Sequence, residues 1–125
     1  MRVGVPREIK NAERRVGLTP ASVRELVAHG HEVVVERHAG VGIGASDADY
    51  AAAGAALHDT AAEVFAVADM IVKVKEPQAS ERAMLRPGQV LFTYLHLAPD
   101  PDQTADLVAS GAVCIAYETV TQAGG

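Results

Sequence analysis

The sequence contains no tryptophan, and only one of its 125 residues, Cys114, is a cysteine. A single cysteine can neither close an internal disulfide nor build a zinc site, so we expect no metal centre. This usage is typical of a reducing compartment and predicts a cytoplasmic location. Cys114 itself lies in an apolar run and is interpreted as a small core residue.

Long apolar runs and concentrated positive charge are also missing. The longest stretch without lysine, arginine, aspartate or glutamate covers residues 87–99, which is shorter than the roughly 20 apolar residues of a membrane span. Residues 1–10 lack the apolar core of a secretory signal peptide. Eleven basic residues stand against 16 acidic ones, for a net charge of −5. We therefore predict no membrane partner and no nucleic-acid partner.

The residues that are present suit one folded α/β domain. Hydrophobic residues make up 49% of the chain, which excludes a disordered protein, and the length fits a single domain. Apolar runs predict strands at residues 1–5, 31–36, 70–75, 89–94 and 113–117. Start signals and helical periodicity predict helices after Thr19-Pro20, after Ser46, over 61–68 and over 101–110. This alternation predicts a mostly parallel sheet of about five or six strands with helices on both faces, as in Rossmann-like and flavodoxin-like domains.

A glycine-rich run, Gly40-Val-Gly-Ile-Gly-Ala45, matches the outline of a dinucleotide-binding motif. Three residues separate it from the preceding strand, although the motif normally begins at the strand end. The segment that follows, residues 55–59, is too short and weak to be the second strand of that motif. We interpret the run as a flexible loop, with phosphate binding as the alternative.

Candidate reactive groups follow three of the predicted strands. The run 7–15 is dense in charge, Lys73 and Lys75 come at the end of a strand, and His96 comes just past another. Because ligands gather at the carboxyl ends of parallel strands, an arginine such as Arg15, a lysine and a histidine could converge there. Arginine can hold a carboxylate with two hydrogen bonds, lysine can polarise a carbonyl, and histidine can transfer a proton near neutral pH. The set suits a small carboxylate with a reactive carbonyl.

Each candidate also has an ordinary structural reading. Loop arginines and lysines at strand ends are usually solvated surface charges. A histidine in an apolar run is more often a hydrogen-bonded structural residue, and Tyr94 could line a pocket but more simply packs. The remaining histidines are interpreted as surface residues: His29, His31, His38 and His58.

Five segments of the sequence carry a combined signature: residues 4–20 (GVPREIKNAERRVGLTP), 30–33 (GHEV), 73–77 (KVKEP), 92–97 (FTYLHL) and 116–120 (AYETV). Together they resemble the N-terminal part of L-alanine dehydrogenase, whose family also includes the NAD-binding alpha subunit of nicotinamide nucleotide transhydrogenase. The resemblance runs collinearly through the whole chain. The segments KVKEP and LHL favour the amino-acid dehydrogenase branch, because they usually read differently in the transhydrogenase branch.

The resemblance implies specific roles. Arg15, chosen over Arg14, matches the arginine that binds the substrate carboxylate, Lys75 matches the lysine at the carbonyl or amino end, and His96 matches the catalytic proton donor and acceptor. Two positions depart from the family pattern: Ala12 stands where asparagine is usual, and Gly17 where alanine is usual. Both flank Arg15 and could loosen its loop.

The resemblance also implies a larger enzyme. Residues 1–125 would form a truncated substrate domain that binds L-alanine or pyruvate, while NAD would be bound mainly by a Rossmann domain absent from this chain, which supplies no cofactor-binding residues. The isolated chain is then expected to be inactive, and the family's hexamers predict a homo-oligomer. The alternatives are the transhydrogenase subunit and a non-catalytic domain that binds small carboxylates.

Overall fold

A six-stranded parallel sheet organises the computed structural model, which describes residues 1–93 and 101–116. The strands lie in the order β3-β2-β1-β4-β5-β6, and every neighbouring pair is parallel. Their bounds are β1 (Arg2–Val5), β2 (Glu32–Glu36), β3 (Ala56–His58), β4 (Met70–Val72), β5 (Val90–Thr93) and β6 (Val113–Ala116). This is the order of a doubly wound, Rossmann-like sheet, as the sequence predicts.

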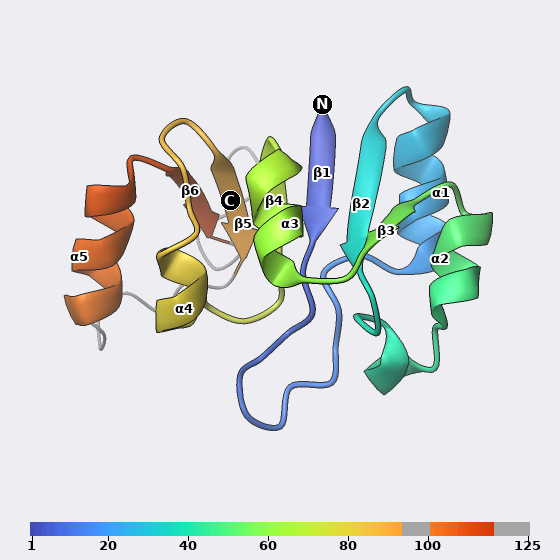
Figure 1. The fold of residues 1–125 in the computed structure, drawn as a ribbon, viewed down its shortest axis with the longest axis horizontal. Helices are drawn as coiled ribbons and strands as arrows, with labels where there is room; N and C mark the ends of the chain where they lie inside the picture. The colour runs from blue at the N-terminus through green and yellow to red at the C-terminus, as the bar shows by residue number, and fades with distance from the viewer. Residues whose placement is uncertain (94–100, 117–125) are drawn as a thin grey trace, which may run out of the picture.

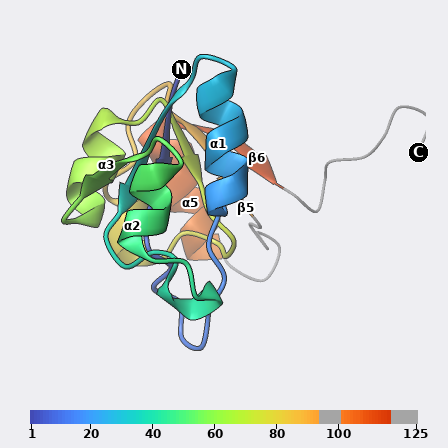
Figure 2. The same ribbon diagram turned by 90° about the vertical axis from the view of Figure 1, so that its right-hand side faces the viewer.

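Helices cover both faces of the sheet. They are α1 (Pro20–Ala28), α2 (Asp47–Ala52), α3 (Ala61–Val67), α4 (Ala79–Arg82) and α5 (Pro101–Ser110), with a 3-10 turn at Val41–Ile43. In Figure 1, α3 lies in front of the central strands and α1 lies behind β2. Figure 2 shows the same sheet from its β3 edge, between α3 on one side and α1 on the other. The chain therefore crosses from one face to the other between β3 and β4.

Two hydrophobic clusters, one on each face, hold these layers together. Val33 and Val35 of β2 pack with residues of α1 and α2, whereas Val34 packs with Val64 and Phe65 of α3. Successive side chains of a strand point to opposite faces, so a run of three valines serves both clusters. Two-sided burial is the reason that β2 reads as continuously apolar in the sequence.

The helix start signals are confirmed in the structure. The Thr19 side chain accepts a hydrogen bond from the backbone N–H of Ser22, with Pro20 as the first residue of α1. Ser46 and Asp49 form a reciprocal capping box at the start of α2. Each pair satisfies backbone N–H groups that a helix leaves without intrahelical partners.

The strand predictions need two corrections. Residues 55–59, rejected as a strand, contain β3, which pairs with β2 at the edge of the sheet; an edge strand needs only one partner and can be short. The strand predicted at residues 70–75 ends at Val72, so Lys73 and Lys75 lie beyond it. The last residues of two other predicted strands, Tyr94 and Tyr117, lie outside the described residues.

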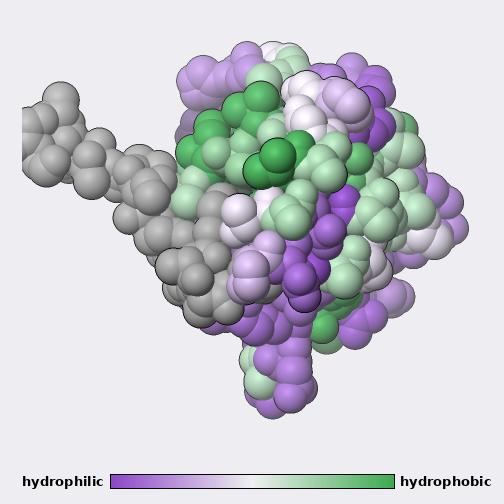
Figure 3. Space-filling view, turned by 90° about the vertical axis from the view of Figure 1, so that its left-hand side faces the viewer, coloured by the Kyte–Doolittle hydropathy of each residue, from purple (hydrophilic) through white to green (hydrophobic). Residues whose placement is uncertain are grey.

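Strand β6 carries apolar side chains that are exposed. Val113 and Ile115 are 52% and 39% exposed, although they belong to a strand. Figure 3 shows hydrophobic residues gathered on this side of the molecule, next to the grey segments. No helix of the described residues is both long and apolar enough to cross a membrane.

Candidate functional site

The loops that follow β1 and β4, the two central strands, lie next to each other at one end of the sheet. The chain leaves β1 through residues 6–19 toward α1, and it leaves β4 through residues 73–78 toward α4. Figure 1 shows both loops below the carboxyl ends of the strands. Because β1 and β4 are neighbours whose crossovers run to opposite sides, this is the switch point of the sheet, where doubly wound domains bind ligands.

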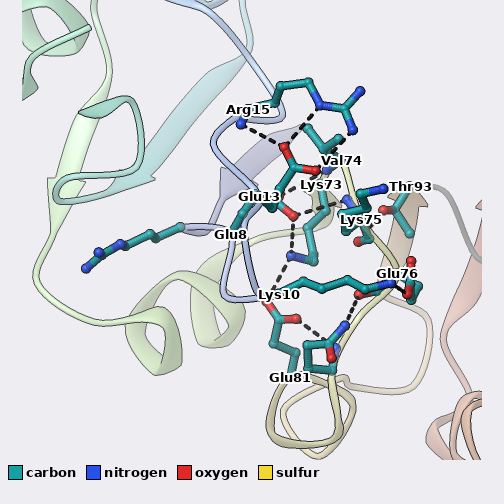
Figure 4. Close-up of polar contacts among 12 residues, drawn as sticks. Glu8, Lys10, Glu13, Arg15, Lys73, Val74, Lys75, Glu76, Glu81 and Thr93 are labelled. Atoms are coloured by element: carbon teal, nitrogen blue, oxygen red, sulfur yellow. Dashed lines mark hydrogen bonds and ion pairs between the residues drawn. The ribbon is translucent and has the colours of Figure 1, made fainter. Parts of the chain in front are cut away.

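Glu8 ties the two loops together. Its carboxylate accepts hydrogen bonds from the Lys73 ammonium at 3.0 Å and from the backbone N–H groups of Val74 at 3.0 Å and Lys75 at 3.1 Å. Figure 4 shows these contacts converging on one side chain, which is 2% exposed. Lys10 forms a second tie through an ion pair with Glu76. The segment bearing Lys75 is thus fixed to the loop after β1.

A buried ion cluster lies behind this junction. The Lys73 ammonium is 3.0 Å from carboxylate oxygens of both Glu8 and Glu81, and all three side chains are at most 2% exposed. Glu81 also accepts a hydrogen bond from the backbone N–H of Gln78 and so caps α4. Burial raises the pKa of Glu81, and the negative charge of Glu8 adds to this effect, while Lys73 offsets part of it. Lys73 is therefore a structural residue, and its side chain is buried in this cluster.

Arg15 is held by an acidic neighbour in its own loop. The Glu13 carboxylate accepts hydrogen bonds from the Arg15 backbone N–H at 2.8 Å and from its Nε and Nη2 at 3.0 Å each. These hydrogen bonds lower the pKa of Glu13 to about 2, with Lys75 adding a small Coulombic contribution. Glu13 thus stays ionised at neutral pH and fixes the guanidinium through its Nε–Nη2 edge.

Arg15 and Lys75 border the same cavity, which has a volume of about 490 Å³. Four of its seven lining residues are cations and one is a carboxylate, in a chain whose net charge is −5. The lining residues are Lys10, Asn11, Ala12, Glu13, Arg14, Arg15 and Lys75. This excess of positive charge suits a small anion. Arg14 borders the cavity too, so the cavity by itself does not separate it from Arg15.

The glycine-rich run has a packing role next to this site. A Cβ atom on Gly42 would lie 2.2 Å from the backbone carbonyl oxygen of Arg14, and one on Gly40 would lie 2.6 Å from the ring of Tyr50. Gly44 ends the 3-10 turn with a φ of 78°. Gly42 therefore packs closely against the backbone of the arginine loop and Gly40 against Tyr50, while the interpretation of the run as a flexible loop stays a prediction.

The two departures from the family pattern behave differently. Ala12 has a φ of 64°, a left-handed conformation that asparagine tolerates better than alanine. Gly17 is tightly packed, since a Cβ atom there would lie 2.4 Å from the carbonyl oxygen of Val72. The close packing at Gly17 contradicts the expectation of a loosened loop there, whereas for Ala12 that expectation stays a prediction.

The structure brings together two of the predicted site residues, Arg15 and Lys75. His96 and Tyr94 lie outside the described residues, so their predicted roles remain predictions. Glu8 and Glu13 occur in the charged run that the sequence points to, but nothing in that run separates buried carboxylates from solvated ones. No group of three or more histidine, cysteine, aspartate or glutamate residues in the described ranges could hold a metal ion.

Fold and site together define a doubly wound α/β domain with a cationic cavity at the switch point. The family described as "Alanine dehydrogenase/PNT, N-terminal domain" matches residues 4–125. The chain belongs to this family.

Curated relatives and solved structures agree with this assignment. Alanine dehydrogenase of Halomonas elongata is 57% identical over 121 residues, which cover 97% of this chain and 33% of that protein. Alanine dehydrogenase of Mycobacterium tuberculosis H37Rv is 54% identical over 125 residues, or 100% of this chain and 34% of that protein. The chain thus spans about a third of the length of these relatives.

Two solved structures share the fold closely. An L-alanine dehydrogenase superposes with a TM-score of 0.95 at 48% identity and covers 99% of this chain and 34% of its own. A transhydrogenase from Sinorhizobium meliloti superposes with a TM-score of 0.90 at 31% identity and covers 98% of this chain and 36% of its own. Both branches of the family therefore share this domain.

Proposed function

We propose that this chain is the substrate-binding domain of an NAD-dependent L-alanine dehydrogenase. The reaction converts L-alanine, NAD⁺ and water into pyruvate, ammonium, NADH and one proton. The observation that carries the proposal is the placement of Arg15 and Lys75 on one cationic cavity at the switch point. The high identity to proteins named alanine dehydrogenase supports the same reaction.

In this proposal Arg15 and Lys75 bind opposite ends of the substrate. Arg15 binds the carboxylate shared by alanine and pyruvate, for which a guanidinium is geometrically suited. Lys75 contacts the carbonyl oxygen of pyruvate or the amino end of alanine. His96 takes up a proton as water adds during oxidation and returns it during reduction, because imidazole titrates near neutral pH.

The nicotinamide cofactor supplies the hydride chemistry when it is bound. In the described residues, three residues separate the glycine-rich run from the end of β2, and the run forms a 3-10 turn instead of leading directly into a helix. A dinucleotide motif needs its first glycine at the strand end and a helix N-terminus directly behind it, so the run does not fit the cofactor. We therefore propose that NAD is bound mainly by a further domain, that the isolated chain is inactive, and that the working enzyme is a cytoplasmic homo-oligomer.

A graft tests the proposal. This chain replaces the matching N-terminal third of the Halomonas elongata alanine dehydrogenase, and the reductive amination of pyruvate is followed through NADH absorbance. We expect an active enzyme in which Arg15→Lys raises the KM for pyruvate by about tenfold or more, because losing part of a charged hydrogen-bond pair costs about 1.5–3 kcal/mol. An inactive but folded graft, or an unchanged KM in Arg15→Lys, would contradict the proposal.

The transhydrogenase subunit is the second candidate, favoured by the neighbour from Sinorhizobium meliloti. It would bind NAD(H) and no amino acid. A non-catalytic domain that binds small carboxylates is a third possibility. Pyruvate titrated into the labelled chain and followed by NMR separates them: shifts around the cavity favour the dehydrogenase or the carboxylate-binding domain, and activity of the graft then selects the dehydrogenase.

A further inference from the structure

The backbone of Lys75 is held from both sides by buried side chains. Its N–H group donates to Oε1 of Glu8 at 3.1 Å, and its carbonyl oxygen accepts a hydrogen bond from the hydroxyl of Thr93 at 2.7 Å. The Glu8 side chain is 2% exposed, and Thr93 is fully buried. Figure 4 shows Glu8 and Thr93 on opposite sides of Lys75. Glu8 comes from the loop after β1 and Thr93 is the last residue of β5, and these are the strands on either side of β4.

These contacts explain why the chain leaves the sheet before Lys75. The Lys73 N–H still donates to the carbonyl oxygen of Phe92 in β5, at 3.0 Å. The next two N–H groups, of Val74 and Lys75, turn to the Glu8 carboxylate instead. A buried carboxylate with three hydrogen-bond donors fixes the local backbone more firmly than solvent would. The direction in which Lys75 enters the cavity is therefore set by groups outside its own strand.

We propose that Glu8 and Thr93 are positioning residues that aim Lys75 at the substrate. The proposal rests on the proposed function, in which Lys75 contacts the carbonyl or amino end of the substrate. Neither residue borders the cavity that Lys75 lines, so both act through the backbone of Lys75 and not by contact with the substrate. Catalytic geometry is sensitive to such support, since a displacement of about 1 Å can cost about 100-fold in rate.

Thr93 offers the sharper test, because it can be changed without disturbing the ion cluster. Thr93→Val keeps the shape of the side chain and removes the hydroxyl, which leaves the Lys75 carbonyl oxygen without this donor. Thr93→Ser restores the hydroxyl. In the graft described above, we expect Thr93→Val to raise the KM for pyruvate by about tenfold and Thr93→Ser to bring it back to within about threefold of the parent, with the KM for NADH unchanged in both.

A control variant separates positioning from general loss of stability. Val23→Ala removes buried methyl groups in α1, a helix that contributes no residue to the cavity. It should lower the melting temperature and leave the KM for pyruvate unchanged. If Val23→Ala raises that KM as much as Thr93→Val does, or if Thr93→Val leaves it unchanged, the positioning role is refuted.

A double-mutant cycle connects Thr93 to Lys75 and distinguishes the two proposals. If Thr93 acts through Lys75, Thr93→Val should change the KM for pyruvate by less than about twofold once Lys75→Ala is present. A full tenfold effect on that background would overturn the inference. If Lys75→Ala by itself leaves KM and kcat unchanged, the proposed function of Lys75 fails, and the positioning role, which depends on it, fails with it. If Lys75→Ala impairs the enzyme while Thr93→Val does not, only the positioning role fails.

Discussion

The buried cluster of Glu8, Lys73 and Glu81 predicts unequal losses of stability for two chemically identical substitutions. Both carboxylates lie 3.0 Å from the same ammonium. Glu8→Gln and Glu81→Gln each replace a carboxylate by an amide of the same shape. The two glutamates differ in what else they bind, and this difference sets the expected loss of stability.

Glu8→Gln should be strongly destabilising. Besides Lys73, the Glu8 carboxylate serves the N–H groups of Val74 and Lys75, through both of its oxygens. An amide has one oxygen, so one of these donors would face an NH₂ group. Glu81 still faces Lys73 in this variant, so the loss comes from a buried donor left facing an NH₂ group, which costs about 3 kcal/mol at the upper end for such a group, out of the roughly 5–15 kcal/mol that stabilises a typical domain. At about 4 °C per kcal/mol, the melting temperature should fall by roughly 12 °C.

Glu81→Gln should be nearly neutral at pH 7, within about 1 kcal/mol, because the amide oxygen can still cap α4 and Glu8 still neutralises Lys73. Burial raises the pKa of Glu81, so this group costs the folded state stability as it ionises. That cost is absent below the pKa of about 4.3 for an unfolded glutamate, grows as the pH rises from there toward the raised folded pKa, and is constant above the folded pKa. Glu81→Gln should therefore gain stability relative to the parent chain as the pH increases above about 4.3.

Urea unfolding of the three proteins at several pH values between 4 and 9, followed by far-UV circular dichroism, measures both effects. The free energy of unfolding should separate Glu8→Gln from Glu81→Gln by about 2 kcal/mol or more at pH 7. Equal losses in the free energy of unfolding for the two variants would refute the argument that Glu8 contributes more hydrogen bonds than Glu81 does. A difference between Glu81→Gln and the parent that does not change with pH would refute the reasoning about the ionisation of Glu81.

Three further predictions concern the surroundings of the site. Gly42→Ala places a Cβ atom against the Arg14 carbonyl oxygen, so pyruvate binding to the graft should weaken by about tenfold, whereas retained affinity would show that the loop adapts. Ala12→Asn should raise the free energy of unfolding by about 0.5–1 kcal/mol, because asparagine tolerates the left-handed conformation better; a loss of stability in urea titrations would contradict this. The apolar side chains of Val113 and Ile115 should make the purified chain pair with a second copy, with Ile115→Lys shifting it toward monomer; sedimentation showing a monomer at high concentration would exclude the pairing.

Most of the fold could be predicted because its signals are local. Thr19 and Ser46 start helices through contacts within one turn, and the alternation of apolar runs with helices is sufficient for a parallel, doubly wound sheet. The short edge strand β3 was missed because its pairing with β2 comes from neighbours distant in sequence. The end of β4 was misplaced for the same reason, since the carboxylate that ends it, Glu8, lies in another loop.

From the sequence, only the meeting of an arginine and a lysine at the carboxyl ends of the strands could be predicted for this cavity. The rule that ligands gather at the carboxyl ends of strands placed Arg15 and Lys75 near each other, and the structure puts both on one cavity. It could not show that Lys73, two residues earlier, would be buried between two glutamates. Whether a charged side chain is solvated or buried depends on long-range packing, which spacing along the chain does not encode.

Carboxylate side chains hold the cationic residues of the cavity in fixed positions, in a chain whose net charge is negative. Glu13 holds one edge of the Arg15 guanidinium, and Glu76 pairs with Lys10 at the border of the same cavity. Glu8, behind them, neutralises Lys73 and binds the backbone of Lys75 rather than its ammonium. At Arg15 and Lys75 the acidic residues thus act on one edge of the guanidinium or on the backbone, which preserves positive potential in the cavity while restricting its geometry. Removing a carboxylate would increase the positive charge of the site but weaken its order, so charge alone would be a poor guide to variants of this site.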